Sequence, residues 1–142
     1  MQDLQGFYAA LAVLASALGC GLLMGIERER RKGSGPGRAL AGVRSFALAS
    51  LSGAAAALSG SVALLGAGAA FVAALGVVAY ARDRSENPGV ATEIALLLAY
   101  LIGVLCASDR LLAAALAVMV TGLLALRAPL HEFSSHWLQP GE

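Results

Sequence analysis

The chain has 142 residues, of which 58% are hydrophobic and only 13% are charged, and its formal net charge is +1. A water-soluble domain of this size would leave far more apolar surface exposed than it could bury, so the composition excludes an ordinary soluble protein. The small net charge, with basic residues placed beside apolar segments, excludes a nucleic-acid partner. We therefore expect a helical membrane protein in contact with membrane lipids.

The first apolar segment covers residues 7–26, which is the length of helix that crosses a hydrocarbon core about 30 Å thick. No Lys or Arg precedes it and it is longer than the apolar part of a usual signal peptide, so we expect it to remain in the mature protein. Ala17, Gly21 and Gly25 recur every four residues along it. This small-residue stripe predicts close packing, either with another helix of the same chain or at a dimer seam.

A charged segment follows, with Glu27 and Glu29 among its basic residues. We expect the basic side chains to contact anionic lipid or an anion; they are Arg28, Arg30, Arg31, Lys32 and Arg38. The glycine-rich residues 33–38 lack the Lys-Ser/Thr ending of a phosphate-binding loop and follow no strand. A nucleotide site is therefore not favoured there.

Four further apolar segments are predicted at residues 39–60, 61–81, 90–107 and 111–126, separated by turn-forming or charged residues. Gly53 belongs to a second small-residue stripe that favours close helix packing or a dimer seam. The predicted fold class is all-α, a polytopic membrane bundle of about five transmembrane helices. We expect one transmembrane domain at residues 1–130 and a short cytoplasmic tail at residues 131–142 that suits an interfacial helix.

The basic residues predict the orientation of the bundle. With the N-terminus outside, nine of the ten Lys and Arg residues fall on the cytoplasmic side, and only Arg110 lies outside. Short loops rich in Lys and Arg stay in the cytoplasm. We therefore expect the N-terminus outside and the C-terminus in the cytoplasm, with any dimer parallel.

Ionisable residues at the ends of the apolar segments mark the predicted site. Glu27 closes the first segment, Arg44 lies near the start of the second, and Glu93 lies near the start of the fourth. We predict an ion or substrate pathway at the cytoplasmic end, formed by these three residues with Glu29, and with Tyr100 on the face of Glu93. A static ion pair between Arg44 and Glu93 that locks two helices is an equally open interpretation.

Glu27 and Glu93 are the candidate metal ligands. Mg²⁺ keeps several waters around one or two carboxylates, so two glutamates suffice to bind it as a substrate or ligand. Arg44 would repel a cation, which keeps an anionic substrate open. We expect no resident cofactor, and Cys20 and Cys106 are interpreted as small core residues. No nucleophile beside a base is present, so we do not expect an enzyme.

Residues 21–30, GLLMGIERER, and residues 41–48, AGVRSFAL, closely resemble the signature of the MgtC/SapB membrane-protein family. Thr92 and Glu93 resemble the family's Thr-Glu pair, and Ser45 stands where family members usually carry Thr, which preserves a hydroxyl. The resemblance implies a multi-pass protein of the bacterial inner (cytoplasmic) membrane with about five helices. It also implies a link to magnesium homeostasis, for which transport is the default label.

Two functional hypotheses follow. In the first, a homo-oligomer transports or binds an ion, with Mg²⁺ as the expected cation, through the polar cluster. A dimer is the simplest assembly, because the chain ends where its relatives add a second membrane block or a soluble domain. In the alternative, the chain is a non-transporting regulatory or scaffold subunit that binds another membrane protein.

Overall fold

The protein is described here by a computed structural model, which covers the backbone of residues 1–32, 42–82 and 90–137 and the side chains of residues 1–30, 42–82 and 90–126. These described residues form five α-helices and no strand, which confirms the predicted all-α fold with five helices. The helices are α1 (Gln2–Lys32), α2 (Val43–Leu58), α3 (Val62–Arg82), α4 (Ala91–Cys106) and α5 (Arg110–Trp137).

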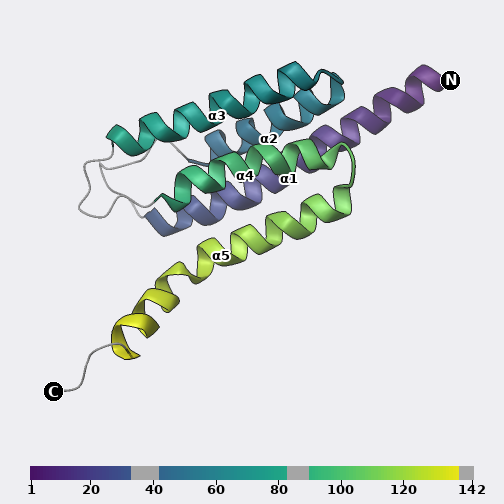
Figure 1. Cartoon of the computed structure of the whole chain (residues 1–142). Coiled ribbons are helices and arrows are strands. Elements are labelled where there is room, and N and C mark those ends of the chain that lie inside the picture. Colours follow the sequence, from purple (N-terminus) through teal and green to yellow (C-terminus); the bar gives the residue numbers. More distant parts are fainter. Residues whose placement is uncertain (33–41, 83–89, 138–142) are drawn as a thin grey trace.

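Consecutive helices run in opposite directions along a common axis, and the N-terminal part of α1 extends beyond its neighbours (Figure 1). One end of the bundle therefore holds the last turns of α1 and α3 with the first turns of α2 and α4, and we call this the polar end. The opposite end holds the connections α2–α3 and α4–α5, and we call this the turn end. The alternation places charged residues from distant parts of the sequence at one end.

Three helix boundaries differ from the sequence prediction. The charged residues expected in a loop after residue 26 continue α1 to Lys32, because Glu, Arg and Lys are good helix formers. Helix α2 begins at Val43 rather than residue 39, and residues 39–41 lie outside the described part. Helix α5 does not stop at residue 126 but continues through Pro129 to Trp137, so residues 131–137 of the predicted tail are helical.

The terminal part of α5 turns away from the bundle (yellow in Figure 1). A proline inside a helix removes one backbone hydrogen bond and bends the helix, which accounts for a change of direction in this region. The other helices stay together because α4 packs against α1, α2, α3 and α5. Helix α4 is therefore the central element of the bundle, with the other four helices packed around it.

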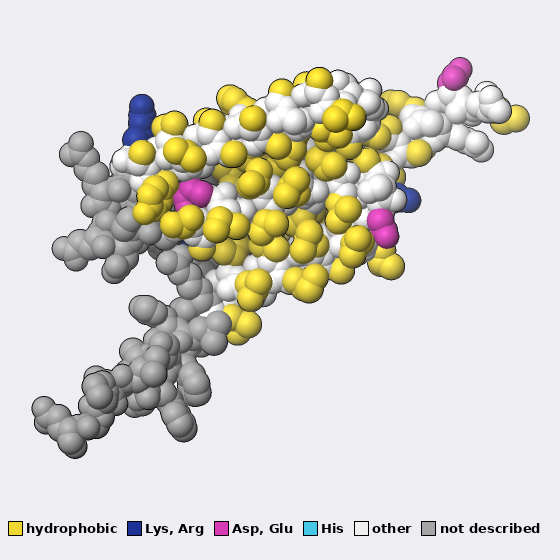
Figure 2. All heavy atoms as spheres, in the orientation of Figure 1, with side chains coloured by type: hydrophobic (Ala, Val, Ile, Leu, Met, Phe, Trp, Pro, Cys, Tyr) yellow, Lys and Arg dark blue, Asp and Glu magenta, His cyan; other side chains and the backbone are white. Residues whose placement is uncertain are grey.

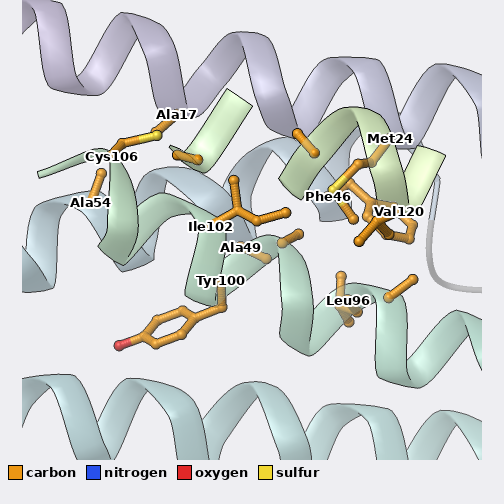
Figure 3. Packing of buried hydrophobic residues seen from close by; sticks show 14 of the residues in the cluster. Ala17, Met24, Phe46, Ala49, Ala54, Leu96, Tyr100, Ile102, Cys106 and Val120 are labelled. Carbon is orange, nitrogen blue, oxygen red and sulfur yellow. The ribbon is translucent and has the colours of Figure 1, made fainter. Parts of the chain in front are cut away.

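The core is built around α4 and contains side chains from all five helices (Figure 3). Tyr100, Phe46, Met24, Ile102 and Cys106 are among the largest fully buried side chains. Small residues between them allow the helix backbones to approach closely. In a membrane, such close packing rather than apolar burial drives helix association.

The small-residue stripe of α1 packs against α2 of the same chain. A Cβ added to Gly21 would lie 2.8 Å from Ala47 Cα, and one added to Gly25 would lie 2.7 Å from Val43 Cα. At Ala17, the backbone carbonyl accepts a hydrogen bond of 2.7 Å from the Ser50 hydroxyl of α2. Intrachain packing thus occupies all three stripe positions, which leaves no space for a second chain there.

Two glycines join α2 to α4 in the same way. An added Cβ at Gly53 would meet the backbone of Tyr100, and one at Gly103 would meet the backbone of Ser50. The sequence analysis identified Gly53 as a packing residue but missed Gly103. The predicted role of Gly53 in helix packing is thus filled within the chain.

The outer surface of the bundle is apolar, with charged side chains near its ends on the face shown in Figure 2. In α3 only Val72 and Gly76 are buried, and large side chains such as Phe71 and Leu75 point outward. So much exposed apolar surface fits a lipid environment rather than water.

Two helical segments, Gln2–Arg30 and Val62–Arg82, are long and apolar enough to cross a membrane by length and composition. Helices α2 and α4 have 16 residues each, and the apolar part of α5 is Arg110–Leu126. At a rise of about 1.5 Å per residue, a 16-residue helix covers about 24 Å, somewhat less than a hydrocarbon core of about 30 Å. Flanking residues or local bilayer thinning accommodate such a difference.

Candidate functional site

The polar end brings together the ionisable residues that the sequence singled out. Glu27 and Glu29 lie in the last turns of α1, Arg44 is the second residue of α2, and Glu93 is the third residue of α4. Glu27 and Glu93 are half-buried, whereas Glu29 and Arg44 are exposed. The alternating helix directions place all four at one end of the bundle, as the sequence predicted.

Glu93 lies between α4 and α3. It contacts α3 at Gly76, where an added Cβ would lie 3.2 Å from Glu93 Cβ. The Glu93 Oε2 atom is buried and has no hydrogen-bond partner among the described residues. A buried carboxylate oxygen without a partner carries a desolvation cost that a bound cation would offset. Glu93 is therefore a candidate cation ligand at the polar end.

Thr92 places a second buried oxygen next to Glu93. Its side chain is 4% exposed, and its Oγ1 atom is buried without a hydrogen-bond partner in the described part of the chain. A threonine in the middle of a helix often donates to the carbonyl four residues earlier, but Thr92 is the second residue of α4 and has no helical carbonyl behind it. The first turn of α4 thus presents two buried oxygens that have no hydrogen-bond partner within the part of the chain that the structure describes.

The sequence analysis named Thr92 only as part of a family resemblance and did not include it in the site. A usable signal was present, because a threonine beside a glutamate at the start of an apolar helix cannot satisfy its hydroxyl within that helix. The N-terminal end of α4 also carries the positive end of the helix dipole, which stabilises a nearby carboxylate. The lack of a hydrogen-bond partner for the Thr92 hydroxyl among the described residues and the favourable helix dipole at Glu93 both follow from the position of these two residues at the start of α4.

Tyr100 lies on the same side of α4 as Glu93, as predicted, because both side chains face glycines of α3. Its ring packs against Gly68, and its hydroxyl donates a hydrogen bond of 2.9 Å to the carbonyl of Leu65. The side chain is only 1% exposed. Tyr100 therefore joins α4 to α3 through a hydroxyl that already has a partner, and its expected part in a pathway stays a prediction.

Arg44 does not neutralise Glu93 in the structure. Arg44 is exposed, and no ion pair joins it to Glu93 among the residues that the structure describes. The physical reason is the position of each residue, since Arg44 is exposed at the start of α2 while Glu93 is held against α3. The static ion pair that the sequence left open is therefore not formed in this arrangement.

Glu29 lies beside the start of α2. Its Oε1 atom is 3.5 Å from the position that a Cβ of Gly42 would take, and Gly42 is the N-cap residue of α2. Gly42 has no side chain to cap the free backbone N–H groups of the first turn. A carboxylate near a helix N-terminus interacts favourably with the positive end of the helix dipole. Glu29 therefore lies where its charge favours the start of α2.

The basic residues expected to contact lipid or an anion begin in the last turns of α1. Arg28 is half-buried and Arg30 is exposed. The side chains of Arg31 and Lys32, and the whole of Arg38, lie outside the described residues. The described part of the set therefore sits at the polar end, on the same helix as Glu27 and Glu29.

Within the described side chains, no group of three or more His, Cys, Asp or Glu residues is arranged to hold a metal ion. A hydrated Mg²⁺ ion needs fewer protein ligands, because it retains several of its waters. The polar end offers candidate donors for such an ion. They are the Glu93 carboxylate and the Thr92 hydroxyl, with Glu27 at the same end of the bundle.

A model of the MgtC family matches residues 14–133, which include all of α2, α3 and α4 and most of α1 and α5. The matched region contains every residue of the polar end described above. No curated protein and no solved structure matches the chain.

Proposed function

Because the chain belongs to the MgtC family, we propose that it is a multi-pass protein of the bacterial inner membrane that binds and transports a cation at its polar end. Family membership suggests a membrane protein involved in magnesium homeostasis, so Mg²⁺ is the expected substrate. The proposed orientation has the N-terminus outside and the polar end in the cytoplasm. The basic residues Arg28, Arg30, Arg44 and Arg82 at this end support that orientation.

The observation that carries the proposal is the buried Glu93 Oε2 atom without a hydrogen-bond partner among the described residues. Its neighbour Thr92 Oγ1 is in the same condition. A cation bound at the first turn of α4 would compensate the negative charge of the Glu93 carboxylate. The oxygen of the Thr92 hydroxyl would coordinate the same cation. Ionisable groups inside membrane segments are costly, and they commonly mark ion pathways for this reason.

The position of Arg44 favours a cation over an anion at Glu93. The sequence analysis raised the objection that Arg44 would repel a cation, but Arg44 is exposed and forms no described ion pair with Glu93. The negative charge of Glu93 therefore stays available to a ligand. An anionic substrate would have to bind elsewhere, beside the basic residues at the end of α1.

Ion flux into liposomes that contain the purified protein tests the proposal. We expect Mg²⁺ uptake by the wild type and its loss in Glu93→Gln, which keeps the side-chain size but removes the charge. Asp3→Asn is the matched control, because Asp3 is an exposed carboxylate in the first turn of α1, away from the polar end, and it should retain flux. Equal Mg²⁺ uptake by wild type and Glu93→Gln, or uptake of anions alone, would contradict a cation site at Glu93.

A non-transporting regulatory or scaffold subunit is the second candidate. The outward face of α3 supports it, because this helix buries only Val72 and Gly76 and leaves a long apolar surface for lipid or another membrane protein. Absence of flux for every tested ion from well-folded protein would favour this function. A parallel homodimer stays part of both proposals, with a seam away from the α1 stripe, which packs on α2.

A further inference from the structure

The two cysteines of the chain meet in the folded protein. Cys20 lies on α1 and packs against the buried core that contains Cys106, the last residue of α4, and the two thiols interact. Both are free thiols in the structure. The sequence predicted both as small core residues, because each lies inside an apolar segment without a Cys/His cluster. Packing of α1 against α4 brings them together.

The thiol contact is held by well-packed elements. Cys106 is 1% exposed and lies beside Ala17 of α1 (Figure 3). Cys20 follows Ala17 by about one helical turn and is only half-buried, packed against the same core. The Ser50 hydroxyl fixes α2 to the carbonyl of Ala17 at this level. Cys20 and Cys106 are therefore held on neighbouring helices at the same level of the bundle.

We propose that Cys20 and Cys106 form a redox modification site, at which an intramolecular disulfide links α1 to the end of α4. The oxidant is a disulfide donor. The more exposed Cys20 thiolate attacks the donor disulfide and releases one donor thiol, and Cys106 then displaces the second to form the Cys20–Cys106 bond. The pair loses two electrons and two protons, and the donor gains them as two thiols.

The location of the pair fits this chemistry. Cys106 ends α4 at the turn end, next to the exposed residues Ala107, Ser108 and Asp109. In the orientation proposed above, the turn end faces the outside of the cell membrane, where disulfides form and persist. The placement of the turn end outside rests on the proposed topology, whereas the contact between α1 and α4 does not.

The redox state of the cysteine pair would be linked to the candidate ion site, because both lie on helix α4. Helix α4 carries Thr92 and Glu93 in its first turn and Cys106 at its last residue. A bond to α1 fixes the far end of this helix and closes a long loop of the chain, so the oxidised protein should unfold at a higher temperature than the reduced protein.

The test uses the full chain in detergent micelles, treated with diamide, a small azo oxidant that takes up the two electrons and two protons. The protein is then denatured, alkylated and analysed by mass spectrometry. We expect wild-type protein to lose both alkylatable thiols as a monomer, to yield a linked peptide pair containing Cys20 and Cys106, and to regain both thiols with a reductant.

The matched control combines Cys20→Ser with Gly19→Cys. It keeps two thiols but moves one about 100° around α1, to a position where nothing lies within 4 Å of an added Cβ. This variant should keep both thiols under the same treatment. Wild-type protein that retains both thiols, links only between molecules, or reacts no faster than the control would overturn the proposal. Gel filtration before oxidation confirms that both proteins are folded.

Discussion

Glu93 on α4 lies against Gly76 on α3, and the absence of a side chain at Gly76 creates the space that the glutamate occupies. An added Cβ would be 3.2 Å from Glu93 Cβ and 3.6 Å from Glu93 Cγ. These distances are tight enough that the glutamate must move if residue 76 gains a methyl group. The position of Glu93, and with it the proposed function of the polar end, thus depends on Gly76 of α3.

Gly76→Ala should therefore displace Glu93. We expect loss of most Mg²⁺ flux together with a modest destabilisation of about 1 kcal/mol, since the helix gains alanine while the α3–α4 contact is overpacked. Flux assays and thermal unfolding in detergent measure the two effects. Gly66→Ala is the control on the same helix, because nothing lies within 4 Å of an added Cβ there. Normal flux in Gly76→Ala would show that the position of Glu93 is not critical.

Thr92→Val should separate stability from function. Valine keeps the branched shape, and the lost hydroxyl has no hydrogen-bond partner among the described residues. We expect unchanged or slightly higher stability, by up to about 1 kcal/mol, because a buried polar atom without a partner is removed. Mg²⁺ uptake should fall, because a coordinating oxygen is lost.

The contrasting variant is Thr121→Val on α5, where the Thr121 hydroxyl donates to the carbonyl of Ala117 at 2.7 Å. This substitution removes a hydrogen bond that is made, so it should not stabilise the protein, and it should leave flux intact. If Thr92→Val loses stability as Thr121→Val does and keeps full flux, the Thr92 hydroxyl is not an ion ligand.

Tyr100→Phe tests whether the tyrosine packs helices or lines a pathway. The substitution removes the hydroxyl that donates to the Leu65 carbonyl at 2.9 Å but keeps the ring against Gly68. We expect a loss of about 1 kcal/mol in unfolding free energy, the usual value of one hydrogen bond, and unchanged Mg²⁺ flux. Loss of flux at unchanged stability would instead support the predicted place of Tyr100 in the pathway.

Gly103→Ala should disrupt the bundle more strongly than any other small change in α4. The new methyl group would collide with the backbone of Ser50 on α2, and backbone cannot move aside as a flexible side chain can. We expect a destabilisation of about 3 kcal/mol or more, measured by denaturant unfolding in detergent. Gly122→Ala on α5 has open space at the Cβ position and should unfold like the wild type.

The sequence by itself determined the class of the protein and its number of helices. Long apolar segments separated by turn-forming or charged residues can be recognised from the local sequence. In a membrane, such a segment forms its backbone hydrogen bonds internally by becoming a helix. The charges at segment ends also predicted correctly that Glu27, Glu29, Arg44 and Glu93 share one end. Boundaries were less well predicted at α1 and α5, because the apolar segments were ended at charged residues through which the helix continues.

Only the tertiary structure decided which helix faces meet. In the folded chain Arg44 is exposed and does not pair with Glu93, which lies against Gly76 instead. The fold also brings Cys20 and Cys106 together. These relationships depend on the rotation and offset of each helix, which the close contacts of small residues such as Gly53 and Gly103 select. The apolar content and length of a segment do not change when its helix rotates about its own axis. The sequence pattern therefore determined the helices, and the backbone contacts between them determined the site.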